Sequence, residues 1–272
     1  MRIHFKNTAL ISVVSVALFF SSPSFSASYE CPKAAQEDYK GDLQVSSKYD
    51  STDPTRSTEV PVDRHSLIIQ KQLNQFSAGI VYFSDYYARY REDRRGELAL
   101  NCLHNWVSHW ASQSALTTDN STFTGKALRS WTLSSISSSL LKVSHLTNGQ
   151  WKLAAEESQW LNQLAQLVKE DFSGRIGGET TRINNHDYWA AWSVMATARL
   201  TKDRDLADWA YVIFKHAITQ AVYDARTNTA YLPNEIKRGS LGVHYTHFAL
   251  TPLVMLAEHL PQPNLLLLLL GV

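Results

Sequence analysis

Residues 184–189, with the sequence NNHDYW, place two carboxamides, an imidazole, a phenol and an indole next to one another. Asn favours helix starts, because its side-chain oxygen can accept from the first free backbone N–H groups. Residues 190–198 are then small or apolar, which is typical of a helix packed closely on its neighbours. His186 can exchange protons near neutral pH. So many functional groups on the first turn of an apolar helix predict the rim of a binding or catalytic site.

A second segment, 233–247, carries Arg238 and Tyr245 seven residues apart. Arg238 offers a fixed cation that can pair with a carboxylate, and Tyr245 offers a phenol. Each residue also has an ordinary alternative: a lone His is often a cap or core residue, an Arg near a helix start often forms a surface ion pair, and a Tyr on an amphipathic helix is often core. Only the combination with His186 favours a functional site.

Composition excludes several classes of protein. With 26 basic and 25 acidic residues the net charge is +1, so we expect no nucleic-acid partner. GxSxG, a phosphate-cradling glycine loop and HExxH are all absent from the sequence, which removes common hydrolase, nucleotide-binding and zinc-protease interpretations. The 8 Trp, 12 Tyr and 10 Phe could provide platforms for sugar rings, although aromatic-rich helical cores have the same composition.

The N-terminus has the pattern of a secretory signal peptide. A basic start is followed by a short apolar run from Thr8 to Phe20, and small residues at Ser24 and Ser26 predict cleavage after about Ser26. The apolar run is too short to span a bilayer. We therefore expect export, a signal peptide at 1–26, and no membrane association after cleavage.

Cys31 and Cys102 are the only two cysteines. In an oxidising compartment such a pair suggests one disulfide between the N-terminal arm and a helix. Two unpaired thiols are the alternative. Nothing in the sequence resembles a metal-ligand set.

The chain divides into an arm, a helical domain and a tail. Residues 27–63 are polar and interrupted by prolines, which predicts an extended arm; its polar run 46–50 has the ordinary interpretation of a solvated loop. Residues 64–260 show apolar side chains at helical spacing without strand alternation, and predict an all-α layered or toroidal array of antiparallel helix pairs. Helices are expected at about 65–90, 97–116, 125–145, 151–172, 184–200, 205–218 and 243–260, and an extended segment at 231–235.

The tail, 261–272, contains six consecutive leucines at 265–270. Such a run has neither helical nor strand amphipathicity and is too short to span a membrane. We expect a truncated or frameshifted reading frame here, or a fragment.

Residues 184–195 (NNHDYWAAWSVM) closely resemble the signature of the mannuronate-type alginate lyases of polysaccharide lyase family 5. Further segments agree in the same order: Cys31-Pro32, 47–49 (SKY), Cys102 with Asn105-Trp106, 124–126 (TGK), 204–209 (RDLADW) and 232–238 (LPNEIKR). The resemblance implies an α/α toroid, a periplasmic location and alginate as substrate, and it favours the Cys31–Cys102 disulfide. It also implies that the toroid is incomplete, because family members continue well beyond residue 260. We expect a monomer.

The resemblance also implies roles in a β-elimination. Arg238 and Asn185 would neutralise the uronate carboxylate, His186 would assist or accept the C5 proton, and Tyr245 would protonate the leaving O4 and could itself be the base. No metal or cofactor is implied, since Arg and amide donors supply the positive field.

Five further residues are implied to bind substrate: Lys48, Tyr49, Lys126, Trp189 and Glu235. The chain departs from the family pattern at Phe248, where relatives commonly have Tyr, and at 239–240, where relatives are more basic. Two other interpretations stay open: a non-catalytic alginate-binding or structural helical protein, and a lyase or hydrolase for another polyuronate.

Overall fold

The computed structural model describes residues 31, 41–176 and 183–259. The predicted signal peptide at 1–26 and the leucine-rich tail at 261–272 lie outside these residues. Within them, none of the helices combines the length and the apolar character needed to cross a membrane.

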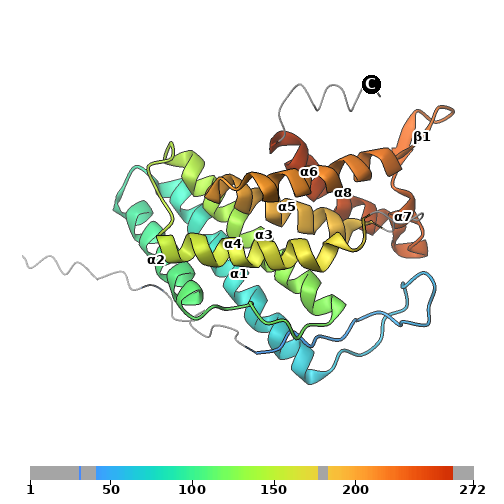
Figure 1. Ribbon diagram of the computed structural model, residues 1–272, viewed down its shortest axis with the longest axis horizontal. Helices are drawn as coiled ribbons and strands as arrows, with labels where there is room; N and C mark the ends of the chain where they lie inside the picture. The colour runs from blue at the N-terminus through green and yellow to red at the C-terminus, as the bar shows by residue number, and fades with distance from the viewer. Residues whose placement is uncertain (1–30, 32–40, 177–182, 260–272) are drawn as a thin grey trace, which may run out of the picture. The chain divides into compact units, whose positions relative to one another are not determined.

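Eight α-helices account for most of the described chain (Figure 1). They confirm the predicted helices to within a few residues at most ends, because helical periodicity marks a helix better than its termini. Their bounds are α1 Arg64–Tyr90, α2 Arg94–Ser112, α3 Phe123–Leu146, α4 Ala155–Ser173, α5 Asn185–Thr201, α6 Arg204–Gln220, α7 Pro233–Ile236 and α8 Gly242–His259, with a 3-10 turn at Gly239–Leu241.

Two local expectations were wrong. The segment expected to be extended at 231–235 becomes helical at α7, since Pro233 stands at the first helical position, where its missing N–H costs nothing. A hairpin of β1 (Val222–Asp224) and β2 (Thr229–Tyr231) also forms, with Tyr223 opposite Ala230. Strands of three residues are too short to display a recognisable alternation.

Helix α5 is the centre of the packing. It contacts α3, α4, α6 and α8, and in Figure 1 it lies between α4 and α6. Its small residues allow these close approaches: Ala190, Ala191 and Ala196 are fully buried. The body of α5 is thus held on several sides, which fixes the position of its first turn.

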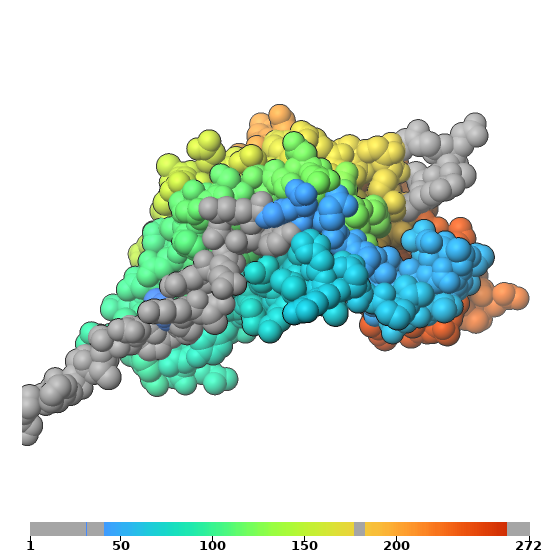
Figure 2. Space-filling view, turned by 90° about the horizontal axis from the view of Figure 1, so that it is seen from below, coloured from blue at the N-terminus to red at the C-terminus, as the bar shows by residue number. Residues whose placement is uncertain are grey.

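The N-terminal arm is anchored to the helices at its start. Cys31 and Cys102 form a disulfide with a Cα–Cα distance of 5.3 Å, which confirms the predicted bridge to α2. Leu43 donates its N–H to the Asn120 carbonyl at 3.0 Å. A Cβ on Gly125 would come within 1.9 Å of the Leu43 carbonyl oxygen, so only glycine allows the arm to lie this close to α3. Figure 2 shows the blue arm residues beside the orange and red residues of the C-terminal helices.

Candidate active site

The first turn of α5 is built by a reciprocal cap. Asn184 Oδ1 accepts from the His186 N–H at 3.0 Å, and Asp187 Oδ2 accepts from the Asn184 N–H at 2.8 Å. This is the capping box, in which a short polar residue and an acid three positions later satisfy each other's backbone donors. The NNHD sequence therefore determines where α5 begins and places Asn185 and His186 in its first turn.

An ion pair between Arg175 and the buried Asp187 stabilises that turn. Asp187 has a fully buried side chain and accepts from Arg175 Nε at 2.6 Å and from Arg175 Nη2 at 2.9 Å. Burial raises the pKa of the Asp187 carboxyl, and the hydrogen bonds and charge of Arg175 act in the opposite direction. The Arg175 guanidinium also lies 5.3 Å from the centre of the Phe123 ring.

Asn185 is held by Glu235 of α7. Both residues are buried, and Glu235 accepts from the Asn185 backbone N–H at 2.6 Å and from Asn185 Nδ2 at 2.7 Å. Asn185 Oδ1 is buried without a hydrogen-bond partner among the described residues. A buried acceptor of this kind is costly unless a ligand satisfies it.

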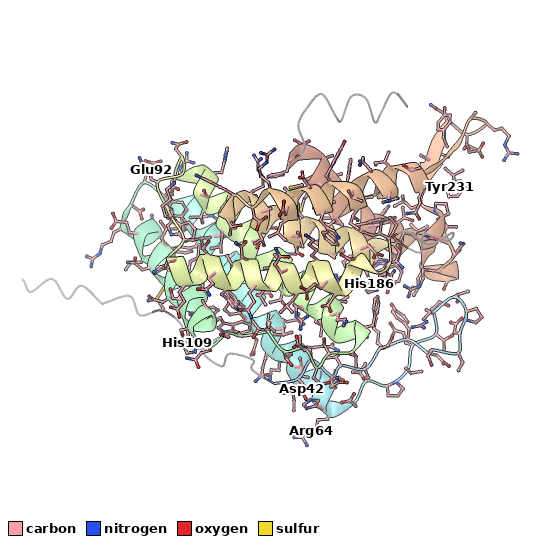
Figure 3. The ribbon with its side chains drawn as sticks, viewed as in Figure 1. Asp42, Arg64, Glu92, His109, His186 and Tyr231 are labelled. Atoms are coloured by element: carbon pink, nitrogen blue, oxygen red, sulfur yellow. A yellow bond between two sulfur atoms is a disulfide. The ribbon has the colours of Figure 1, made fainter. Side chains whose placement is uncertain are left out.

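His186 is enclosed by aromatic rings, and Figure 3 labels it on the side of the helices where the arm passes. Its ring stacks on Trp131 with centroids 5.6 Å apart and meets the edge of Phe123 at 5.1 Å. Burial, together with the charges of Arg175 and Arg238, lowers the pKa of His186 to about 4. The imidazole is therefore neutral at pH 7, with one nitrogen able to accept a proton. Its Nδ1 is buried without a partner in the described part of the chain.

Arg238 is oriented by the arm. Its Nε donates to the Thr55 carbonyl at 3.0 Å and its Nη2 to the Arg56 carbonyl at 2.6 Å. The guanidinium lies 3.9 Å from the centre of the Tyr245 ring and 4.9 Å from that of Tyr49. A cation over an aromatic face is attracted by the ring quadrupole.

Tyr245, near the start of α8, is half-buried and donates its hydroxyl to the Tyr49 hydroxyl at 2.7 Å. Burial, with the bond to Tyr49, raises the pKa of Tyr245 to about 12, and the charge of Arg238 opposes this. The phenol is protonated at neutral pH and can donate.

Phe248 lies between Tyr245 and the two tryptophans near the start of α5, Trp131 and Trp189. Its ring lies 6.4 Å from Tyr245, 6.0 Å from Trp131 and 5.2 Å from Trp189 between centroids. Trp189 also donates its indole N–H to the Phe248 carbonyl at 3.2 Å. The structure thus brings together seven of the nine residues that the sequence marked as catalytic or substrate-binding: Tyr49, Asn185, His186, Trp189, Glu235, Arg238 and Tyr245.

The two lysines each have a carboxylate partner. Lys48 pairs with Glu59 at 2.9 Å, at an exposed position where its ammonium lies 4.9 Å from the centre of the Tyr49 ring. Lys126 pairs with Asp171 of α4 at 2.8 Å. Lys48 is therefore in contact with the site through Tyr49, whereas the ion pair of Lys126 connects α3 to α4.

Trp131, Phe123 and Arg175 surround His186 but were not predicted as site residues. Trp131 lies in α3 at helical spacing from Leu128, a pattern typical of a core side chain, yet its indole Nε1 is buried without a partner among the described residues. No sequence signal distinguishes such an indole from an ordinary core Trp. Arg175 lies just after Gly174, the C-cap of α4. Only its ion pair with Asp187 shows that it belongs to the surroundings of the site.

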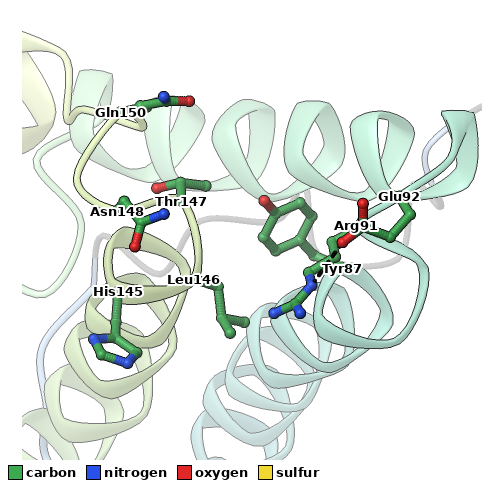
Figure 4. A pocket seen from close by; sticks show the side chains of 8 residues that line it. All are labelled: Tyr87, Arg91, Glu92, His145, Leu146, Thr147, Asn148 and Gln150. Carbon is green, nitrogen blue, oxygen red and sulfur yellow. Dashed lines mark hydrogen bonds and ion pairs between the residues drawn. The ribbon is translucent and has the colours of Figure 1, made fainter.

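A pocket of about 500 Å³ lies away from these residues, at the C-terminal ends of α1 and α3 (Figure 4). Its walls include Tyr87, Arg91 and Glu92 from one helix end and His145 from the other. It includes none of the predicted site residues. Among the described residues no group of three or more His, Cys, Asp or Glu side chains is arranged to hold a metal ion.

Comparison with known proteins identifies the family to which this chain is similar. A sequence profile described as Alginate lyase matches residues 44–265. An alginate lyase of Pseudomonas aeruginosa PAO1 is 37% identical over 232 residues, which cover 84% of this chain and 60% of the relative. One from Pseudomonas putida KT2440 is 36% identical over 233 residues, covering 83% and 59%. The chain spans about 60% of the length of these curated relatives.

Solved structures show the fold. Alginate lyase A1-III from Sphingomonas species A1 superposes with a TM-score of 0.64 at 20% identity, covering 85% of this chain and 61% of that one. A variant of A1-III complexed with tetrasaccharide gives a TM-score of 0.63 at 19% identity, covering 82% and 58%. The predicted all-α class and α/α toroid architecture are confirmed. Because the profile match extends over most of the sequence, the chain belongs to the alginate lyase family.

Proposed function

We propose that this protein cleaves poly(mannuronate) by β-elimination at 4-O-linked uronates and releases unsaturated oligosaccharides. The observation that carries the proposal is the convergence of a guanidinium, a neutral imidazole, a carboxamide and a protonated phenol from Arg238, His186, Asn185 and Tyr245. Membership of the alginate lyase family supports alginate as the substrate.

The difficult step is the removal of the weakly acidic C5 proton. Arg238 and Asn185 neutralise the adjacent carboxylate, so that negative charge developing in the enolate-like intermediate meets fixed donors rather than water. Arg238 suits this role because its bonds to the Thr55 and Arg56 carbonyls fix the guanidinium beside the Tyr245 ring. Asn185 suits it because its Nδ2 uses one N–H on Glu235 and has a second N–H that can donate to the carboxylate.

Tyr245 protonates the leaving O4, since its phenol carries a proton at neutral pH. The base is either His186 or Tyr245 itself. In mannuronate the C5 hydrogen and the C4 oxygen lie on the same ring face, so one phenol can serve both steps. His186 is neutral at the same pH and can also accept a proton. Such groups contribute about 10²- to 10⁴-fold each.

The pH dependence of kcat/KM separates these two bases. If His186 is the base, activity rises through its pKa of about 4 and is level from there to neutral pH. If Tyr245 is the base, activity climbs with pH well above neutrality, because its pKa is about 12 in the free protein.

Substrate binding uses the exposed side of the site. Lys48 binds a neighbouring carboxylate, and Tyr49 and Trp189 shape the sugar subsites. Lys126 is the cation that would have to leave Asp171 in order to bind substrate. Glu235 is buried and acts through Asn185, to which it is hydrogen-bonded.

We propose a periplasmic, monomeric protein. The leader pattern at 1–26 supports export, and a disulfide is a feature of oxidising compartments. Cell fractionation and the elution volume in size-exclusion chromatography test these two points.

Incubation of the purified protein with poly(mannuronate), poly(guluronate) and hyaluronate tests the activity. Ultraviolet absorbance of an unsaturated product on the first polymer supports the proposal. Binding without turnover indicates an alginate-binding protein, and turnover of another polymer indicates a lyase of different specificity. Tyr245→Phe and His186→Ala should each abolish the absorbance while the circular dichroism of the helices is unchanged, and activity persisting in both variants contradicts the assigned roles.

A further inference from the structure

The carboxylate of Glu235 makes an unusually complete contact with a single partner. Its Oε1 accepts from the Asn185 backbone N–H at 2.6 Å, and its Oε2 accepts from the Asn185 side-chain Nδ2 at 2.7 Å. Glu235 has no exposed surface, and Asn185 is 1% exposed. A carboxylate so placed offers nothing to a sugar directly, so its influence on a substrate must pass through Asn185.

Glu235 selects one of two orientations of the Asn185 carboxamide. A carboxamide can rotate by half a turn and exchange its oxygen for its NH₂ group with little change in shape. An ionised carboxylate only accepts hydrogen bonds, so it stabilises the orientation with Nδ2 toward it. The second Nδ2–H is then left to donate to a ligand carboxylate, while the buried Oδ1, which has no partner in the described chain, can accept only from a donor such as a sugar hydroxyl.

We propose that Glu235 is a positioning residue that locks the Asn185 carboxamide in the orientation required for the substrate carboxylate. This inference rests on the proposed lyase activity and deepens it. It replaces direct substrate binding by Glu235 with an indirect role.

The same residue couples the two chain segments that form the site. Glu235 belongs to α7, and its own carbonyl accepts from the Arg238 backbone N–H at 3.0 Å. Asn185 lies fifty residues earlier, at the first position of α5. The Glu235 side chain therefore fixes the Asn185 carboxamide relative to the Arg238 guanidinium. In the proposed reaction these two groups bind the same substrate carboxylate.

Glu235→Gln tests this directly, because glutamine has the same shape and can still make two hydrogen bonds. Its carbonyl can accept from the Asn185 backbone N–H, while its NH₂ group can donate to Asn185 Oδ1 if that carboxamide turns over. The fold is kept and the orientation is reversed. We expect kcat on poly(mannuronate) to fall about 10²-fold, the usual effect of losing one donor at a developing negative charge, with little change in KM.

Glu157→Gln is the matched control. Glu157 is also buried at a helix start, where it accepts from the Ala154 backbone N–H at 2.8 Å and from the Ser108 hydroxyl at 2.6 Å. It contacts none of the site residues in these bonds. The control should lower the thermal midpoint to a similar extent as Glu235→Gln and leave kcat unchanged; an equal loss of kcat in both variants overturns the proposal.

A double-mutant cycle separates positioning from a general structural effect. If Glu235 acts only through Asn185, then Glu235→Gln should reduce kcat little further in an Asn185→Ala background. Multiplying effects of the two substitutions would show that Glu235 acts by another route, and would overturn the inference.

A readout independent of activity keeps this test distinct from that of the function. In wild-type protein one Asn185 side-chain amide proton should exchange slowly with solvent, and its NMR signal should move in Glu235→Gln but not in Glu157→Gln. If wild-type protein gives no unsaturated product, the proposed function fails while these signals still decide the positioning role. Rapid exchange of both amide protons overturns it.

Discussion

The two halves of the site are built on opposite principles. The half at the start of α5 is buried: Asp187 and Glu235 have no exposed surface, and they hold the helical turn with three and two hydrogen bonds, respectively. The half formed by the arm and α8 is half-buried and held by few bonds, namely one between two hydroxyls and two from Arg238 to backbone carbonyls.

This difference suits different tasks. A buried turn keeps a carboxamide and a neutral imidazole in fixed positions, because low polarity around them strengthens each hydrogen bond and disfavours protonation. The accessible half presents a cation and a phenol where a polymer can reach them. The comparison predicts that losing the ion pair that supports the first half acts mainly on stability, whereas changes in the second half act mainly on binding and the pH profile.

Asp187→Ala should have the largest effect on stability. The substitution leaves Arg175 without its buried partner and removes a cap from α5, and breaking a buried pair in this way costs about 3 to 5 kcal/mol. Urea unfolding followed by circular dichroism measures the change. Asp224→Ala, which removes an exposed pair with Arg226, is the control and should cost less than about 1 kcal/mol. Equal losses in the two variants would falsify the view that the α5 turn is the more tightly held half.

His186 should make the stability of the protein depend on pH. Its folded-state pKa of about 4 lies below the unfolded value of about 6.5, so the unfolded chain binds the proton more readily. Stability is therefore unaffected by this group above about pH 6.5 and falls as the pH drops toward 4, by about 3 kcal/mol in all. Urea midpoints at pH 7.5 and 4.5 should differ more for wild type than for His186→Gln, which cannot titrate. The same difference in both proteins contradicts the assignment.

The helix start in the buried half could be predicted from local sequence, whereas the contacts that orient Arg238 in the accessible half could not. The NNHD sequence carries its own cap, so local rules place Asn184 at the helix start. The bonds from Arg238 to the arm span more than 180 residues and end on backbone carbonyls, whose positions no residue type announces. Trp131 escaped prediction because helical spacing gives the same signal for a core side chain and for one that stacks on a functional imidazole.

Tyr49→Phe, a change in the accessible half, should have a smaller effect, and the quantity that changes is the pH profile of kcat/KM. The Tyr245 hydroxyl donates to Tyr49, and this bond helps to raise the pKa of Tyr245. Its loss lowers that pKa by less than about one unit, as expected for a hydrogen bond worth about 1 kcal/mol. The alkaline limb of the kcat/KM profile should move to lower pH. Tyr223→Phe removes an exposed phenol that donates to Asn228 and should leave the profile unchanged. A limb that stays in place in Tyr49→Phe argues against Tyr245 as the acid.

Glu59→Gln should have the smallest effect on stability and a visible one on binding. Lys48 and Glu59 are 56% and 65% exposed, and exposed pairs contribute about 0.2 to 1 kcal/mol. Removing the carboxylate frees Lys48 for the polymer and also removes a negative charge beside the site. The KM for poly(mannuronate) should fall about two- to threefold at low salt, a change of the size expected for one exposed pair. The gain should shrink at high salt, because exposed charges are screened there. An unchanged KM at low salt would mean that Lys48 takes no part in binding, and would leave Arg238 as the cation that recognises the substrate from this half.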